Sequence, residues 1–300
     1  MSNGEETKSE EELKIIPLLH PWKIFFWEAF LFSLTLGLGI VAASRINEIL
    51  KIQKIGIHQI SFWKFVISFL FATLFILLLI RFLKFEPGRR IIFKFLFTLT
   101  VLLGGLLFLE AWFSEPIPFF ILFLLIFWWL KKPSVLNQDI LMILGMAGVG
   151  STLGLALQPI IVVALLIIFS IYDFIAVYKT KHMVKMAKEM IESRAILALI
   201  IPKNILGFQE SLEKIEPGGK FLILGGGDVI FPLLFSASLV PVSILNSLIV
   251  AIFSLVGLFI GFYIFTRQPP TSPGGGRQPI PALPPIALFC ILGYLLTKLI

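Results

Sequence analysis

Two aspartates occur inside long apolar stretches of this 300-residue chain, where an ionisable side chain is energetically costly. Asp173 lies in the segment FSIYDFIAVYK, and Asp228 lies in KFLILGGGDVIFP. Two carboxyl groups that share a low-dielectric site cannot both ionise at low cost, so one of them keeps its proton. The ionised carboxylate can accept a proton from a water that attacks a carbonyl, while the protonated one polarises the carbonyl oxygen. The pair therefore indicates acid–base hydrolysis, provided that the fold brings both carboxyls together.

The two segments place their aspartates at similar depth. Asp173 lies six residues before Lys179, and Asp228 lies eight residues after Lys220 in the next apolar run. Because a helix rises about 1.5 Å per residue, the carboxyls are expected roughly 9 and 12 Å below the same membrane surface. Consecutive spans that run in opposite directions would let the two side chains face each other.

Neighbouring residues distinguish this pair from other carboxyls in the apolar runs. Tyr172 carries a phenol beside Asp173 that can donate a hydrogen bond. Three glycines directly precede Asp228 and allow a second backbone to approach closely. For Glu28, at comparable depth, and Glu110, at the far edge of its run, we expect interfacial carboxyls that reach water. The three glycines are Gly225, Gly226 and Gly227.

The composition indicates a membrane protein with several spans. Hydrophobic residues make up 58% of the chain, charged residues make up 14%, and the mean hydropathy is +0.98. A soluble domain has fewer apolar and more charged residues. No nucleic acid partner is expected despite the net charge of +7, because the basic residues lie in short connections between apolar runs.

Nine apolar runs follow one another along the chain, most of them long enough for a transmembrane helix. The predicted fold is therefore an all-α polytopic membrane protein of about nine helices in contact with membrane lipid. The runs are expected at residues 22–44, 60–83, 91–109, 116–130, 138–157, 159–178, 220–241, 243–265 and 281–299.

The basic residues predict the direction of these spans. About 20 of the 25 Lys and Arg residues lie in the N-terminal tail and in the connections on the same side of the membrane. Because basic residues concentrate on the cytoplasmic side, the N-terminus is expected in the cytoplasm. The protein is then a multi-pass protein of the cell membrane with both aspartates toward its cytoplasmic side.

Four regions divide the chain. The long connection is expected to be cytoplasmic, with an amphipathic segment from His182 to Leu199 that lies on the bilayer surface. A Pro/Gly-rich stretch at 267–285 is not expected to be helical and leads into the last span. The regions are a cytoplasmic polar tail (1–21), six spans with Asp173 in the sixth (22–178), the connection (179–219) and three spans (220–300).

Other hydrolytic chemistries lack their residues within the spans. The histidines His20, His58 and His182 lie near span ends or in connections, so no Ser–His dyad is expected at depth. The sequence contains no HExxH motif, and the single Cys290 excludes a thiolate cluster. We therefore expect no metal and no other cofactor.

A second glycine-rich stretch, LGMAGVGSTLG, surrounds Ser151. The spacing of Ala147 from Ser151 and of Gly150 from Gly154 is typical of small residues at a close helix contact. We therefore expect this stretch to pack helices together and not to present a nucleophile.

Three short motifs, taken in order, resemble those of a known protease family. The segment YDFIAVYKTKHM in particular resembles the archaeal presenilin homologues. The part of the chain that carries the motifs covers roughly residues 137–300. The first four spans are similar to the family only in number and hydropathy. Tyr172-Asp173, Gly225-Gly226-Gly227-Asp228 and Pro281-Ala282-Leu283 resemble the YD, GxGD and PAL motifs of the presenilin and signal peptide peptidase family of intramembrane aspartyl (GxGD) proteases.

The resemblance implies an aspartic endopeptidase that hydrolyses peptide bonds within transmembrane segments or signal peptides. Asp173 and Asp228 would be its catalytic pair, in a hydrated cavity between the sixth, seventh and ninth helices. Such substrates are the expected partners, and self-association of the chain is left open. Gly226 stands where presenilins usually carry leucine, which does not support a presenilin-like cleavage specificity. Substrate docking near the pair would be shaped by Pro281, Ala282 and Leu283.

Two alternatives share part of this pattern. Prepilin peptidases also pair an aspartate with GxGD, but they lack the PAL element. A proton- or cation-coupled transporter would use the same intramembrane aspartates and the helix broken at residues 225–227. An inverted repeat would favour the transporter, yet the first half of the sequence contains no counterpart of the three motifs. The protease interpretation is therefore preferred.

Overall fold

The computed structural model describes residues 21–82, 86–180, 190–215, 221–268 and 280–299, and this part of the chain contains nine long α-helices and one two-stranded sheet. The strands are β1 (Ala198–Pro202) and β2 (Phe221–Gly225). The helices are α1 (Pro21–Ile52), α2 (Phe62–Phe82), α3 (Glu86–Leu109), α4 (Ile117–Lys131), α5 (Val135–Ala156), α6 (Pro159–Ile175), α8 (Gly226–Leu239), α9 (Ile244–Arg267) and α10 (Leu283–Leu299).

Each of the nine predicted runs overlaps one of these helices, and the described residues are mostly helical as expected. By length and composition, five helices can cross a membrane, namely α1, α5, α9, the 91–109 part of α3 and the 159–179 stretch that begins with α6. The described residues also contain shorter apolar helices at residues 62–75, 117–131, 226–239 and 283–299.

The seventh run differs from its prediction, because it begins as a strand. The span expected at 220–241 starts with β2 and becomes helical only at Gly226. Residues 221–225 pair with β1 in an antiparallel register that joins Ala198 to Gly225 and Pro202 to Phe221. The helix begins late because residues 221–225 are paired with β1 and because Gly225 is a poor helix former.

The amphipathic helix expected from His182 to Leu199 is wrong at its C-terminal end. Residues 182–189 lie outside the described part of the chain, and the helical residues that follow end at Ser193. Ala198 to Pro202 form β1, and all five of its residues are buried. In this strand the β-branched isoleucines pack well on a pleated, buried surface.

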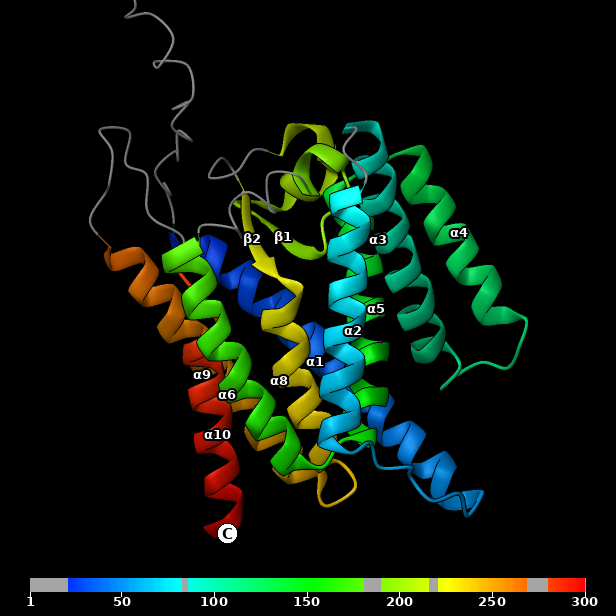
Figure 1. Ribbon diagram of the computed structural model, residues 1–300, viewed down its shortest axis with the longest axis vertical. Helices are drawn as coiled ribbons and strands as arrows, with labels where there is room; N and C mark the ends of the chain where they lie inside the picture. The colour runs from blue at the N-terminus through cyan, green and yellow to red at the C-terminus, as the bar shows by residue number, and fades with distance from the viewer. Residues whose placement is uncertain (1–20, 83–85, 181–189, 216–220, 269–279, 300) are drawn as a thin grey trace, which may run out of the picture.

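The helix α5 lies at the centre of the bundle and contacts α1, α3 and α8 (Figure 1). Close approach depends on its glycines, as the spacing predicted. A side chain at Gly148 would collide with the backbone of Gly104 on α3, and side chains at Gly150 or Gly154 would collide with α8. The expected packing role of this stretch is therefore confirmed.

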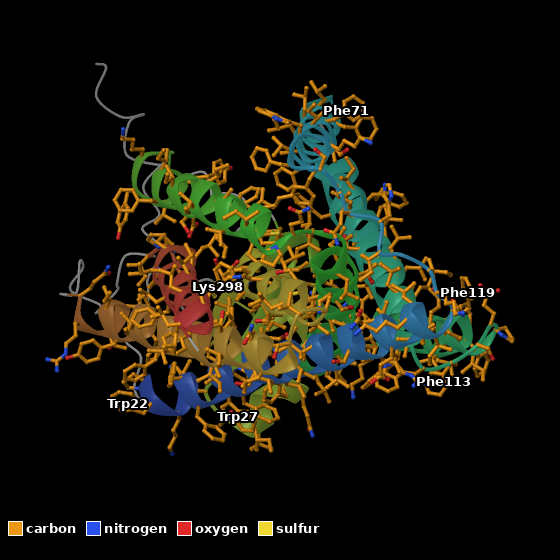
Figure 2. All side chains as sticks on the ribbon, turned by 90° about the horizontal axis from the view of Figure 1, so that it is seen from below. Trp22, Trp27, Phe71, Phe113, Phe119 and Lys298 are labelled. Carbon is orange, nitrogen blue, oxygen red and sulfur yellow. The ribbon has the colours of Figure 1, made fainter. Side chains whose placement is uncertain are left out.

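Aromatic and aliphatic side chains cover the outside of the bundle. Figure 2 shows Phe71, Phe113 and Phe119 projecting from its periphery, and all three side chains are exposed. An apolar surface of this extent is unfavourable in water and favourable in hydrocarbon. The outer surface thus fits a multi-pass membrane protein.

The two-stranded sheet marks one end of the molecule, which we call the hairpin end and define by residues 198–202 and 221–225. Helix α1 begins at this end, and α10 ends at the opposite one (Figure 1). The strand β2 continues directly into α8, so the sheet fixes where that helix starts (Figure 1).

The tight contact between α3 and α5 gives a first prediction. Gly148→Ala should destabilise the fold by about 1–3 kcal/mol, because its new methyl group would overlap the Gly104 carbonyl and separate the helices. A methyl group added to Gly37 on α1 would have no other atom within 4 Å, so Gly37→Ala should be neutral or stabilise the helix by about 0.5–1 kcal/mol. Thermal unfolding in detergent measures both changes, and equal midpoints for the two variants would contradict this packing.

Candidate active site

Asp228 lies in the first turn of α8, directly after the junction with β2. Gly225 is the N-cap residue of α8, and its backbone N–H donates a hydrogen bond to the Asp228 carboxylate. An acidic side chain three residues after the N-cap commonly bonds back to the N-cap in this way. The helix N-terminus also favours a negative charge, because its free N–H groups carry partial positive charge. The local sequence therefore holds the carboxylate at the start of the helix.

Close contacts leave little room for a side chain at two of the three glycines. A side chain at Gly225 would bring its first carbon within 2.9 Å of Asp228 Oδ2. A side chain at Gly226 would come within 3.0 Å of the Leu197 carbonyl, which accepts the Gly226 N–H. Gly227 has more room, since the nearest atom belongs to Phe231 at 3.9 Å. The glycines thus let the strand, the helix and the carboxylate meet at one point.

Asp173 lies near the C-terminal end of α6, just before the π-helical turn at Ala176–Thr180. Its side chain is only 8% exposed. The backbone N–H of Leu283, the first residue of α10, donates a hydrogen bond of 3.3 Å to Asp173 Oδ2. This carboxylate, like that of Asp228, therefore faces the beginning of a helix.

The fold brings the two aspartates together. Helices α6, α8 and α10 contact one another, and the Asp173 and Asp228 carboxyls are close enough for an electrostatic interaction. Each carboxyl accepts a backbone N–H, so each is oriented by the main chain and not by a mobile side chain. The sequence spacing placed the pair at one depth, and the structure also places it in one site.

The segment before α10 borders this site. Pro281 and Leu283 are buried and Ala282 is half-buried. The carbonyl of Pro285 in the first turn of α10 lies so close to Gly257 of α9 that a side chain there would collide with it. The start of α10 is thus held against α9, which fixes the Leu283 N–H that Asp173 accepts.

Tyr172 does not share the environment of its neighbour. Its side chain is 62% exposed, whereas that of Asp173 is buried. Adjacent side chains on a helix point about 100° apart, so the phenol faces a different side of α6 from the carboxyl. A hydrogen bond from the Tyr172 phenol beside Asp173, which the sequence allows, therefore stays a prediction.

A polar cluster at the N-terminal end of α5 anchors β1, and the sequence did not predict it. Asp139 Oδ1 accepts the backbone N–H of Ile200 at 2.9 Å, which fixes the middle of the strand. Gln138 Oε1 accepts the indole N–H of Trp129 at 2.9 Å, and Gln138 Nε2 donates to the Ile196 carbonyl. Because β1 pairs with β2, this cluster indirectly positions the start of α8. Asp139 drew no attention in the sequence because it lies at the edge of the predicted run at 138–157.

The two glutamates behave differently from each other. Glu110 is exposed at the end of α3, as expected for an interfacial carboxyl. The expectation for Glu28 is wrong, since its side chain is only 5% exposed and lies on the buried face of α1. It interacts electrostatically with Asp228. The position of Glu28 along α1 does not reveal which face of the helix is buried.

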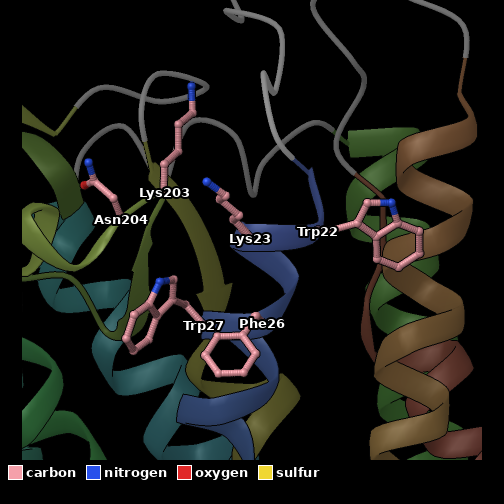
Figure 3. A pocket seen from close by; sticks show the side chains of 6 residues that line it. All are labelled: Trp22, Lys23, Phe26, Trp27, Lys203 and Asn204. Carbon is pink, nitrogen blue, oxygen red and sulfur yellow. The ribbon is translucent and has the colours of Figure 1, made fainter.

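A surface cavity opens between the start of α1 and the segment after β1, but neither aspartate lines it (Figure 3). This cavity is therefore not the hydrated cavity that the sequence predicts around the pair. Within the described residues, no group of three or more His, Cys, Asp or Glu side chains is arranged to hold a metal ion. The cavity in Figure 3 is lined by Trp22, Lys23, Phe26, Trp27, Lys203 and Asn204.

Two solved structures of a presenilin family intramembrane aspartate protease resemble this fold. The structure in space group C222 superposes with a TM-score of 0.60 at 21% sequence identity and covers 92% of this chain and 98% of its own. The structure in space group P2 gives a TM-score of 0.52 at 25% identity over 89% of this chain and 96% of its own. No curated protein sequence matches the chain.

A polytopic helical fold with two interacting aspartates inside the apolar bundle is typical of an intramembrane hydrolase of the aspartyl type. The family described as "Signal-peptide peptidase, presenilin aspartyl protease" matches residues 28–300, so the chain belongs to this family. The protein is a presenilin family intramembrane aspartyl protease. This membership disfavours the transporter alternative.

The anchor of β1 gives a second prediction. Asp139→Leu should destabilise the protein by about 1–3 kcal/mol, because the buried Ile200 N–H loses its acceptor. Asp139→Asn retains a carbonyl oxygen at the same position and should change the stability much less. Thermal unfolding in detergent compares the two variants. If the leucine variant unfolded no earlier than the asparagine variant, the hydrogen bond would not be what holds the strand.

Proposed function

We propose that Asp173 and Asp228 are the catalytic pair, and that the protein cleaves peptide bonds within transmembrane segments or signal peptides. The observation that carries this assignment is the hydrogen bond from the Leu283 N–H to Asp173 Oδ2 opposite Asp228. It links the motif at residues 281–283 to Asp173, and Asp173 interacts electrostatically with Asp228 of the third motif. Family membership supplies the reaction, and the geometry supports these residues as its agents.

The chemistry requires a single proton on the pair. The ionised carboxylate removes a proton from water, and the water oxygen bonds to the carbonyl carbon of the scissile peptide. The protonated carboxyl gives its proton to the carbonyl oxygen, which forms a tetrahedral diol. The C–N bond then breaks as the newly protonated carboxyl gives its proton to the leaving nitrogen and the ionised carboxylate removes a proton from a hydroxyl of the diol. The products are a new C-terminus and a new amine, and the pair regains its starting state as one titrating unit.

The substrate must be extended where it is cut. A transmembrane helix keeps its peptide carbonyls in internal hydrogen bonds, so water cannot attack them until the helix unwinds. Pro281 and Ala282 form an irregular segment that leads into α10 at Leu283, whose N–H bonds to Asp173, and this segment is suited to hold an unwound backbone near the pair. An extended peptide can use its own N–H and C=O groups to add to such a segment. We propose that these three residues dock the substrate.

The direction in the membrane follows from charge. About 20 of the 25 basic residues lie in the N-terminal tail and in the connections that the sequence assigns to the same side of the membrane, which supports a cytoplasmic N-terminus. Because α1 begins at the hairpin end, we infer that this end is cytoplasmic as well (Figure 1). The aspartates lie close to the hairpin end through β2 and α8. Cleavage should therefore occur in the cytoplasmic half of the membrane, in single-span proteins or signal peptides that reach the site laterally.

The assignment of the pair gives a third prediction. Asp173→Asn and Asp228→Asn should each abolish cleavage of a single-span substrate by purified protein in detergent. In each variant an amide replaces one carboxyl, so the remaining carboxyl cannot both accept and return the protons of the reaction. The control is Glu110→Gln, which changes an exposed acidic residue at the end of α3 and should keep wild-type activity. Retained cleavage in either asparagine variant, at normal thermal stability, would refute the assignment.

The Leu283 hydrogen bond gives a fourth prediction. Leu283→Pro removes the donor to Asp173, and proline is tolerated in the first turn of a helix, so the fold should persist. Leu283→Ala keeps the N–H and loses only side-chain packing. The proline variant should have a kcat at least about tenfold below that of the alanine variant, since a hydrogen bond to a charged group is worth about 1.5–3 kcal/mol. Equal kcat values for the two variants would show that this N–H does not orient the pair.

A further inference from the structure

The cavity at the start of α1 has no part in the function proposed above. It lies between α1 and the segment that follows β1, and its volume of about 320 Å³ is within the range of small-molecule sites. Figure 3 shows Lys23, Lys203 and Asn204 on its upper rim, with the rings of Phe26 and Trp27 below them. The cavity therefore has a polar rim and an aromatic wall.

The polar rim carries positive charge without a counter-charge among the described residues. No acidic residue lines the cavity, and neither Lys23 nor Lys203 forms an ion pair in the described part of the chain. Asn204 Oδ1 already accepts the Gly207 N–H at 3.1 Å, so the amide NH₂ group is the part of this side chain left to bind a ligand. Two ammonium groups and an amide donor attract an anion, and lysine commonly binds phosphate.

The aromatic wall continues as an apolar stripe along the outside of α1. Its residues follow one another at intervals of four, which places them on one face of the helix, and each is at least 38% exposed. Twelve residues of helix rise roughly 18 Å, which is close to half of the ~30 Å hydrocarbon core of a bilayer. The α1 stripe consists of Trp22, Phe26, Phe30 and Leu34.

The segment on the other side of the cavity also exposes apolar side chains. Ile205 and Leu206 directly follow Asn204 and are 65% and 69% exposed. Trp27 packs edge-on against Phe208 of the same segment, with ring centres 5.2 Å apart, so α1 and this segment are joined beside the cavity. Tryptophans and lysines next to exposed apolar residues are typical of the membrane–water interface. The cavity therefore lies where lipid headgroups meet hydrocarbon.

We propose that this cavity binds the headgroup of an anionic phospholipid. The lipid phosphate accepts hydrogen bonds from Lys23, Lys203 and the Asn204 amide, and an acyl chain lies along the α1 stripe. Free phosphate would fill only the polar rim, and an acidic peptide would leave the stripe uncovered, so a lipid is the occupant that matches both parts. The site goes beyond the proposed function and does not depend on the roles of Asp173 and Asp228.

The test is the Kd of phosphatidylglycerol for the full-length protein in a non-ionic detergent, measured by native mass spectrometry at one fixed ionic strength. Lys23→Gln and Lys203→Gln should each raise this Kd about fivefold, the effect of one basic residue beside an anionic lipid surface. Neither lysine is buried, so both variants should fold. Lys214→Gln is the matched control, because Lys214 is an exposed lysine of the same connection that does not line the cavity, and it should leave the Kd unchanged.

Other ligands in the same measurement distinguish the possible occupants. Phosphatidylcholine has the same phosphate, but its quaternary ammonium cancels the negative charge, so it should bind more weakly than phosphatidylglycerol. Inorganic phosphate and a peptide with the sequence of residues 1–12, which contains five glutamates, are anions without acyl chains. If any of these three ligands bound as tightly as phosphatidylglycerol, the proposal would be overturned.

Thermal unfolding in detergent gives a second readout. A ligand that binds the native state stabilises it by mass action, so phosphatidylglycerol should raise the unfolding temperature of the wild type. The increase should be smaller for the double variant with Lys23→Gln and Lys203→Gln. Equal increases in the wild type and the double variant, or an unchanged Kd in both single variants, would show that the lipid does not bind at this cavity.

Discussion

The structure depends on how two carboxylates obtain hydrogen-bond donors inside an apolar bundle. In hydrocarbon, water is scarce, and the N–H groups within a regular helix are already bonded. Only the beginning of a helix offers free N–H groups. The protein begins two helices within the bundle, α8 and α10, and places one aspartate against the N–H of each start region. The backbone N–H groups at these two helix starts are therefore the hydrogen-bond donors of the site.

Each break is stabilised by a different device. The start of α8 is fixed by the two-stranded sheet, which is anchored through Ile200 to Asp139 of α5, and by glycines that admit the close backbone contacts. The start of α10 is fixed by Leu283 and by contact of the Pro285 backbone with Gly257. The two regions meet because α6, α8 and α10 pack together. The main-chain geometry at the two helix starts thus determines where both aspartates lie.

Much of this arrangement could be predicted from the sequence. Apolar runs located the nine long helices of the described residues, and the depth of Asp173 and Asp228 relative to flanking lysines indicated a shared level in the membrane. The strands could not be predicted, because ALIIP and FLILG are short apolar runs that read equally well as helix in a hydrophobic chain. Their identity depends on pairing between segments that are distant in the sequence. Local periodicity contains no information about such pairing.

Which face of a helix is buried could not be predicted from the sequence. The buried face of α1 depends on its contacts with α8 and α9, so depth alone predicted an interfacial Glu28, although its side chain is buried. Adjacency to Asp173 likewise does not reveal where Tyr172 points, because adjacent helical side chains point in different directions. The sequence was informative for residues that belong to a motif. For residues whose role depends on the direction of the side chain, the tertiary structure was needed.

The most direct measurement of the central claim is binding of a hydroxyl-containing aspartyl transition-state analogue to the purified protein, compared among the wild type, Asp173→Asn and Asp228→Asn. Such an analogue imitates the tetrahedral diol and needs both carboxyls at once. We predict saturable binding to the wild type that competes with substrate, and loss of binding in both variants at unchanged thermal stability. Equal binding to all three proteins would contradict the claim that these two aspartates form one catalytic site.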